Sequence, residues 1–126
     1  MLVISLMIVA IAIGSASFKD EPKFKNLKVL DKNITKDELE VVMKGFKTAL
    51  GVKCSFCHAA SKMDSTKLDF ASDEKEEKIT ARGMLRMTAR INRKYFKDEK
   101  EPRITCFTCH HGDKEPMKPP VEVPGR

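Results

Sequence analysis

Two short segments contain every cysteine and every histidine of this 126-residue chain. The first is KCSFCHAA at residues 53–60, and the second is TCFTCHHG at residues 105–112. Both contain the pattern C-x-x-C-H, which is the attachment signature of c-type haem. Two cysteines at this spacing lie on one side of a helical turn and can form thioethers with the two vinyl groups on one porphyrin edge. The histidine that follows can then bind the iron.

The two patterns predict two covalently attached haem c groups. The residues expected to bind them are Cys54, Cys57 and His58 for the first haem and Cys106, Cys109 and His110 for the second. A structural zinc site is one alternative. However, the two cysteine pairs lie much further apart than those of common zinc ribbons, and a zinc site would not explain why a histidine directly follows each pair. Two disulfides or a redox dithiol are further alternatives, and the dithiol lacks the βαβ pattern that usually surrounds it.

An iron that only carries electrons needs a second axial ligand, and methionine in that position gives a higher potential than histidine. A methionine on an apolar helical face is more often a core residue than a ligand. Here, however, a haem must lie beside the apolar faces. The candidates are Met43, Met63, Met84, Met87 and Met117.

The residues before the first motif predict a helix over about 36–50. Thr35 and Glu38 form a capping box at its start. Apolar residues then recur at helical spacing, and Gly51 is suited to end the helix. This helix leads the chain directly to the first cysteine.

A second helix is expected over about 73–96, with Ser72 or Asp73 as its N-cap. Acidic residues fill its first turn, as the helix dipole favours. Pro102 prevents its continuation toward the second motif. Residues 60–72 are expected to form a loop, and no segment predicts a β-strand, so the expected fold is all-α.

The composition limits both the core and the partners. Tryptophan is absent and aromatic residues are only 6%, so two porphyrins would supply apolar bulk that the chain lacks. The net charge is +6, but the basic residues are mixed with 18 acidic ones and few aromatic residues accompany them. This pattern argues against nucleic-acid binding. Lysines around exposed haem edges would instead attract an acidic redox protein.

Three regions are expected along the chain. Residues 1–17 are apolar with small residues at their end, which predicts a cleaved signal peptide or an uncleaved membrane anchor. Residues 18–113 form the cytochrome domain and begin with an irregular lead-in. Residues 114–126 form a proline-rich tail. Either form of the first region implies export, to the periplasm or to the outer face of the cytoplasmic membrane.

Three stretches, NLKVLDKNITKDELEVVMKGFKTALGVKCSFCH, KLDFASDEKEEKITARGMLRMTARIN and ITCFTCHHG, resemble the cytochrome subunit family of photosynthetic reaction centres. The resemblance covers about residues 26–113. In that family, each haem unit is a helix with an axial methionine, a turn, and a helix that starts with C-x-x-C-H. The resemblance therefore implies Met43 as the ligand of the first iron and Met84 as that of the second, with Met87 in reserve.

The chain departs from this family in two ways. The well-known members carry four haems, whereas this chain has two motifs and resembles half of such a protein. The residue after the second haem-binding histidine is usually arginine, but here it is His111. His111 is expected to hydrogen-bond a haem propionate, or alternatively to bind a haem of a partner molecule.

The sequence therefore predicts a small all-α dihaem c-type cytochrome with two helix–turn–CxxCH-helix units and long loops. It is expected to carry single electrons between redox partners, such as a membrane electron-transfer complex or other cytochromes, and not to be an enzyme. The alternative is a haem enzyme or gas sensor with one five-coordinate iron, which would bind peroxide, NO or CO.

Overall fold

The computed structural model describes residues 24–118. The elements in this range are helices α1 (Lys36–Leu50), α2 (Cys54–Cys57), α3 (Glu76–Tyr95) and α4 (Cys106–His110), and strands β1 (Ala59–Ala60) and β2 (Leu68–Asp69). The helix-rich character expected from the sequence is confirmed. The predicted signal or anchor at residues 1–17 lies outside the described range, and so does most of the proline-rich tail.

Helix α1 begins and ends where the sequence predicted. The Thr35 hydroxyl accepts a hydrogen bond from the Glu38 backbone N–H at 3.3 Å, and the Glu38 carboxylate accepts one from the Thr35 N–H at 2.8 Å. This pair satisfies backbone donors that have no partner within the helix. At the other end, Gly51 adopts a left-handed conformation with φ of 64°. Glycine takes this conformation without steric cost, so α1 stops there.

The start of α3 differs from the prediction. The helix begins at Glu76 with Lys75 as its N-cap, and no side chain caps it. Ser72 instead accepts a hydrogen bond from the Glu74 N–H at 3.2 Å, within the preceding turn. Asp73 instead forms salt bridges with Lys28, which precedes α1, and with Arg82, which lies within α3. The cap predicted at Ser72 or Asp73 is therefore wrong, because these side chains have better local and tertiary partners.

A small antiparallel strand pair is also present, contrary to the expected loop over residues 60–72. Ala59 pairs with Asp69 and Ala60 pairs with Leu68. Between the strands, the Asp64 carboxylate accepts hydrogen bonds from the N–H and the hydroxyl of Thr66, and so closes the turn. Strands of two residues are too short to show an alternating pattern in sequence.

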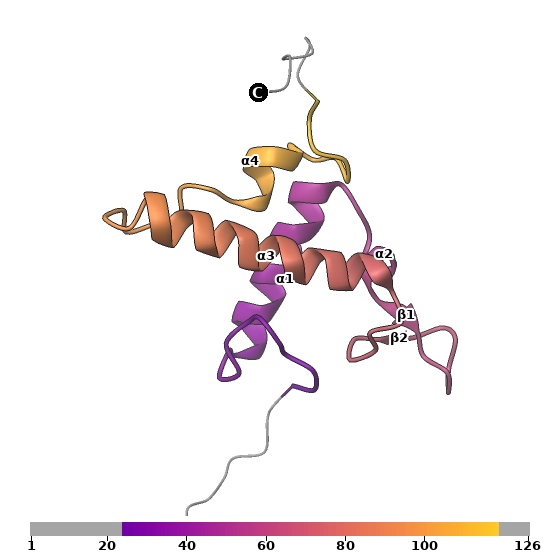
Figure 1. Cartoon of the computed structure of the whole chain (residues 1–126). Coiled ribbons are helices and arrows are strands. Elements are labelled where there is room, and N and C mark those ends of the chain that lie inside the picture. Colours follow the sequence, from indigo (N-terminus) through magenta and orange to yellow (C-terminus); the bar gives the residue numbers. More distant parts are fainter. Residues whose placement is uncertain (1–23, 119–126) are drawn as a thin grey trace, which may run out of the picture.

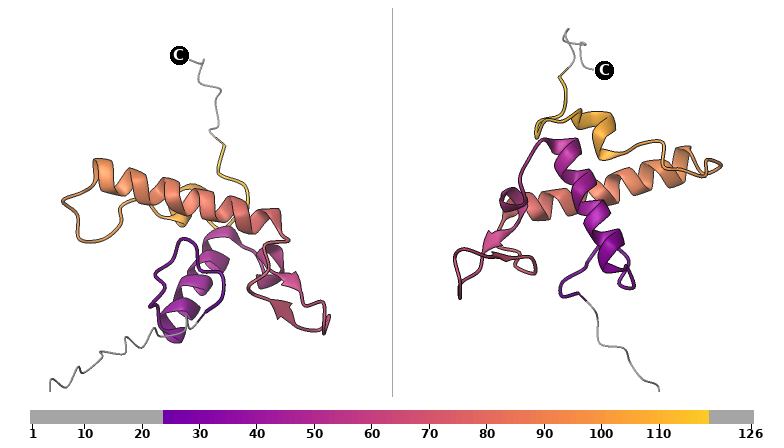
Figure 2. Two further views of the ribbon diagram at one scale, coloured as in Figure 1. Left: turned by 60° about the horizontal axis from the view of Figure 1, so that its bottom comes forward. Right: turned by 180° about the vertical axis from the view of Figure 1, so that it is seen from behind.

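The two long helices cross, and the short motif helices pack against them. In Figure 1, α3 passes across α1, while α4 lies over the C-terminal end of α1. The views in Figure 2 show the strand pair projecting beside α2, away from α4. Helix α4 contacts both α1 and α3, whereas α2 contacts α3. Each C-x-x-C-H segment is therefore supported by the longer helices.

The described residues enclose very little apolar side-chain volume. Among them, only Ala49 and Ala59 are buried apolar residues, and no large side chain is fully buried. Several large apolar side chains are instead exposed, among them Val41, Phe70, Ile79, Met84, Met87, Tyr95 and Phe107. Packed apolar side chains normally supply most of the stability of a domain.

In residues 24–118, no helix is both long enough and apolar enough to cross a membrane.

Candidate haem-attachment sites

The first motif forms the short helix α2. Cys54 begins this helix and Cys57 ends it, so both sulfur atoms come from one turn. The backbone N–H of His58 donates to the carbonyl of Cys54 at 3.0 Å, and His58 then turns into an extended conformation. This turn sends the imidazole to the interior side of the motif.

Two neighbouring cavities lie beside this imidazole. The larger has a volume of about 250 Å³ and is lined by His58, Cys57 and Met43, among others. The smaller has about 90 Å³ and shares these three residues, and Cys54 also lines it. Met43 comes from α1, and the other three residues come from α2 and the residue that follows it. The structure thus brings together all four residues that the sequence assigned to the first haem.

The His58 ring is fixed from one side but lacks a hydrogen-bond partner. It meets Phe70 edge-on, with 5.0 Å between ring centroids. Its Nδ1 is buried, and no hydrogen-bond partner for this atom is present among the described residues. Burial, followed by the charges of Lys78 and Arg82, lowers the pKa of His58. The neutral imidazole is the form that binds a metal.

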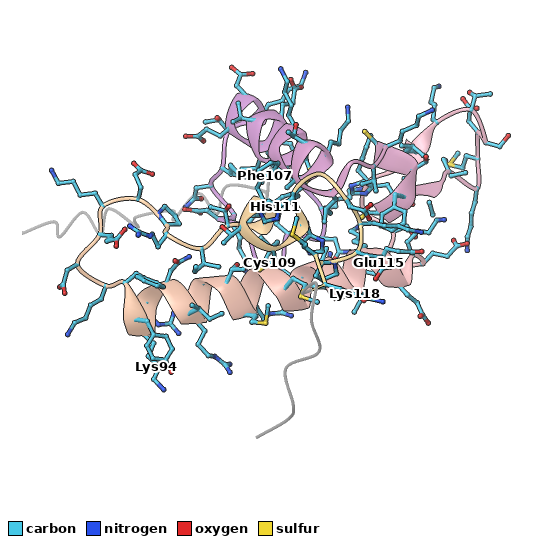
Figure 3. The ribbon with its side chains drawn as sticks, turned by 90° about the horizontal axis from the view of Figure 1, so that it is seen from above. Lys94, Phe107, Cys109, His111, Glu115 and Lys118 are labelled. Carbon is cyan, nitrogen blue, oxygen red and sulfur yellow. The ribbon has the colours of Figure 1, made fainter. Side chains whose placement is uncertain are left out.

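The second motif forms α4, which lies between α1 and α3 in the view of Figure 3. Nδ1 of His110 lies 3.0 Å from the carbonyl oxygen of Asp113. Because a carbonyl oxygen only accepts, Nδ1 carries the proton in this contact. The Nε2 atom is therefore the free acceptor, as an iron-binding histidine requires. Figure 3 also shows Phe107, Cys109 and His111 around this helix.

Asn92 holds the chain that leads into the second motif. Its side-chain N–H donates to the carbonyl of Ile104 at 2.7 Å, and its side-chain oxygen accepts from the Ile104 N–H at 2.8 Å. Ile104 lies two residues before Cys106. The amide of Asn92 therefore acts as a paired backbone segment would, and fixes α4 relative to α3.

The candidate methionines occupy different surroundings. Met43 lines the cavities beside His58. Met84 and Met87 lie on α3, which contacts α4, and they are 40% and 47% exposed. Neither of them lines the two cavities beside His58. Met63, by contrast, is 98% exposed on the loop between the strands, and Met117 is also exposed.

The two motifs are held near each other by backbone contact. The N–H of Gly112 donates to the carbonyl of Ala49, in the last turn of α1, at 2.9 Å. A side chain at Gly51 would collide with the Gly112 carbonyl oxygen. Gly51 lies just before Cys54, and Gly112 lies just after His110. The end of α1 thus brings the two attachment segments together.

The four cysteine thiols test the zinc and disulfide alternatives, and His111 is the one histidine outside the two motifs. All four cysteines are free, and burial raises the pKa of Cys57 and Cys106. In residues 24–118, no group of three or more His, Cys, Asp or Glu side chains could hold a metal ion. The structure therefore does not bring the two cysteine pairs together as a zinc site requires. His111 is exposed, and its ring lies against Phe107 at 5.5 Å.

Sequence reasoning missed several residues that position these sites. Phe70 packs on His58, Asn92 holds the second motif, and Arg82 is buried with only 9% of its surface exposed. Asn92 did offer a signal, since asparagine in a helix interior often has a specific side-chain role. Phe70 and Arg82 offered none, because their partners come from distant parts of the chain.

The residues present fit a covalently bound haem at the first motif. Two thiols, an imidazole and a thioether line neighbouring cavities, and these are the donor types that c-type haem uses. The imidazole of His58 lines both cavities, where its ring could face a bound group. The scarcity of buried apolar side chains also fits a fold completed by a large apolar group. At the second motif the donor types are the same, and the histidine already has its orienting hydrogen bond.

Comparison with known proteins identifies one family. The family described as photosynthetic reaction centre cytochrome C subunit matches residues 9–124. The photosynthetic reaction center cytochrome c subunit of Rubrivivax gelatinosus is 32% identical over 65 residues, which are 52% of this chain and 16% of that protein. Cytochrome c-554 of Chloroflexus aurantiacus is 30% identical, over 78% of this chain and 23% of that protein.

A third relative extends the match along almost the whole chain. The photosynthetic reaction center cytochrome c subunit of Thermochromatium tepidum is 28% identical over 90% of this chain and 27% of its own length. This chain therefore spans about a quarter or less of the length of these relatives. The resemblance noted in the sequence is confirmed. The expectation that the chain is not an enzyme is confirmed at the level of this family, whose relatives are named as cytochromes.

Proposed function

Because this chain belongs to the photosynthetic reaction centre cytochrome c subunit family, we propose that it is a dihaem c-type cytochrome that transfers single electrons. The observation that carries this proposal is the shared lining of the cavities beside His58. Met43, Cys57 and His58 come together there from separate segments of the chain, although only the last two belong to a motif.

In the first site, Cys54 and Cys57 would hold the haem by thioethers, and His58 and Met43 would be the axial ligands. When bound, haem c supplies an iron that accepts and gives up one electron. The chain orients the imidazole through Phe70 and keeps it neutral through burial.

In the second site, Cys106 and Cys109 would form the thioethers, and His110 and Met84 would be the axial ligands. The position of α4 against α3 supports this choice, and so does the orienting hydrogen bond at His110. Met87, one turn further along α3, is the reserve candidate. The backbone contact between Gly51 and Gly112 supports a short distance between the two haems, which electron exchange between them requires.

The partners and location are proposed from the same family. Two of the relatives are named as subunits of photosynthetic reaction centers, which points to redox proteins as partners. These are a membrane electron-transfer complex or other cytochromes. The protein would then be exported, to the periplasm or to the outer face of the cytoplasmic membrane, with attachment through residues 1–17 if these are retained.

The decisive experiment uses the full chain, produced in a host that matures c-type cytochromes. We expect the intact mass to equal the polypeptide plus two haems. We expect the dithionite-reduced spectrum to have a sharp c-type α band that CO leaves unchanged, because both irons already have six ligands. A Soret band that CO shifts would indicate a five-coordinate iron and support an enzyme or gas sensor. A colourless protein without haem mass would refute the proposal.

A further inference from the structure

The charges around the larger cavity beside His58 are unusually one-sided. Its lining residues include four bases, Lys25, Lys28, Lys78 and Arg82. No acidic residue is among the described residues that line it. An apolar cavity with only positive charges in its wall suits a group that carries carboxylates, as haem does. It also imposes a positive potential on whatever lies inside.

Two of these bases are largely removed from solvent. The side chains of Lys78 and Arg82 are each only 11% exposed. Lys78 Nζ donates to the carbonyl oxygens of Phe70 and Ser72, at 2.9 and 2.6 Å. Arg82 donates to the carbonyl of Asn26 at 3.0 Å. These bonds fix both cations against the cavity wall, where water screens their charges poorly.

One carboxylate is shared among three of the bases. Asp73 lies 2.7 Å from Arg82 Nη1, 2.6 Å from Lys28 Nζ and 3.5 Å from Lys78 Nζ. The cluster of Asp73, Lys28, Lys78 and Arg82 therefore keeps a net positive charge. Asp73 does not line the cavity itself, whereas the three bases that it pairs with do.

We propose that the positive charges of Lys78 and Arg82 raise the reduction potential of the first haem. Reduction adds one electron to the iron and removes one unit of positive charge from the site. A fixed positive charge nearby therefore favours the reduced form, and it does so more strongly where the dielectric constant is low. This inference rests on the proposed function, because it requires a haem beside His58.

The position of these charges indicates that they act on the ligand. Lys78, Arg82 and His58 all line the larger cavity. The same two side chains would act on an iron bound to that imidazole. Arg86, one turn further along α3, is exposed and does not line the cavity, so it provides a matched control for the loss of one arginine charge.

The test measures the midpoint potentials of both haems in the full chain, with electrons supplied from an electrode through soluble mediators. Arg82→Gln should lower the midpoint potential of the first haem, which gives the first wave, by about 59 mV. This corresponds to about a tenfold shift of the ratio of reduced to oxidised haem at fixed potential. Asp73→Asn should raise the same wave, because it removes the carboxylate that forms salt bridges with Arg82, Lys28 and Lys78. Arg86→Gln should leave this wave in place, and Arg82→Lys should restore it toward the wild type.

The variant Met43→Ala identifies which wave belongs to the first haem. CO should bind only its opened first iron and should therefore shift that wave alone. An unchanged first wave in Arg82→Gln, shifts of equal sign in Arg82→Gln and Asp73→Asn, or an equal shift in Arg86→Gln would overturn the inference. If Arg82→Gln does not fold, Asp73→Asn decides by the direction of its shift. Failure of the proposed function is distinguishable, since the wild type would then lack two covalent haems and two one-electron waves.

Discussion

The two C-x-x-C-H segments share a pattern but differ in their surroundings. The first lies beside cavities whose walls come from α1, α3 and the segment before α1. The second lies on α4, which contacts α1 and α3, and Phe107 within it is exposed. Among residues 24–118, the buried Nδ1 of His58 has no hydrogen-bond partner, whereas Nδ1 of His110 donates to the carbonyl of Asp113.

This comparison separates what the motif supplies from what its surroundings supply. The motif supplies two thiols and an imidazole at a fixed spacing in both places. The surroundings determine how much of a bound haem would be shielded from water, how strongly its loss would affect folding, and which charges act on it. Equivalent substitutions at the two sites should therefore have effects of different size.

The largest effect is expected from removing one pair of cysteines. In Cys54→Ser/Cys57→Ser the larger cavity loses its covalent occupant, and the apolar side chains around it lose their packing partner. We expect a loss on the scale of the whole stability of many domains, because the described residues bury few apolar side chains of their own. The matched variant Cys106→Ser/Cys109→Ser should keep one haem and stay folded. Intact mass and urea unfolding check both, and equal losses of stability would contradict the difference between the sites.

The next effect concerns the axial methionines. Met43→Ala should destabilise the protein by about 2 kcal/mol, the lower end of the range for buried methionines because Met43 is only half-buried, and open the first iron to CO. Met84→Ala should open the second iron with a smaller loss of stability, because Met84 is 40% exposed. Difference spectra with CO and urea unfolding provide the measurements.

Met63→Ala is the control for these variants, because this side chain is 98% exposed and should affect neither readout. If Met87→Ala binds CO and Met84→Ala does not, Met87 is the ligand of the second iron. If neither variant binds CO, a methionine ligand from α3 is excluded.

A smaller effect is expected where the two sites meet. Gly51→Ala places a side chain at a residue with φ of 64° and against the Gly112 carbonyl oxygen, which should cost about 1–3 kcal/mol. Gly45→Ala, inside α1 with no atom near the added carbon, should instead stabilise by up to about 1 kcal/mol. Thermal unfolding of the two variants measures this contrast. A neutral Gly51→Ala would show that the contact is not needed.

The smallest effect is a pH dependence that belongs to the first site alone. The hydrogen bond from Lys28, with further ones from Arg82 and Asn26, holds the pKa of Asp73 well below its usual range. The stabilisation by this carboxylate should be complete above about pH 4, the unfolded value, and should decline as the pH falls toward the native pKa.

Urea unfolding between pH 5 and the acid limit of the fold checks this expectation. Asp73→Asn should unfold more easily at neutral pH and lose this part of the acid dependence. Asp98→Asn, an exposed residue after α3, is the control and should keep the wild-type profile. An Asp73→Asn profile parallel to that of the wild type would rule out this contribution.

Local sequence determined the attachment chemistry and the helix ends whose partners are adjacent. The capping box at Thr35 and the stop at Gly51 each depend on residues within one turn, so the bounds of α1 were correctly predicted. The two C-x-x-C-H patterns likewise carry their spacing within five residues. The family followed from the same motifs together with the helices between them.

Only the tertiary structure decided which residues stand around each motif. Asp73 was expected to cap a helix, but it binds Lys28 and Arg82, because their charges are brought to it from distant positions. Met43 on α1 and His58 after α2 line the same cavities, and Phe70 contacts the His58 ring from just after a strand pair too short to be recognised. Contacts between distant residues depend on the packing of whole elements, and no local pattern records them.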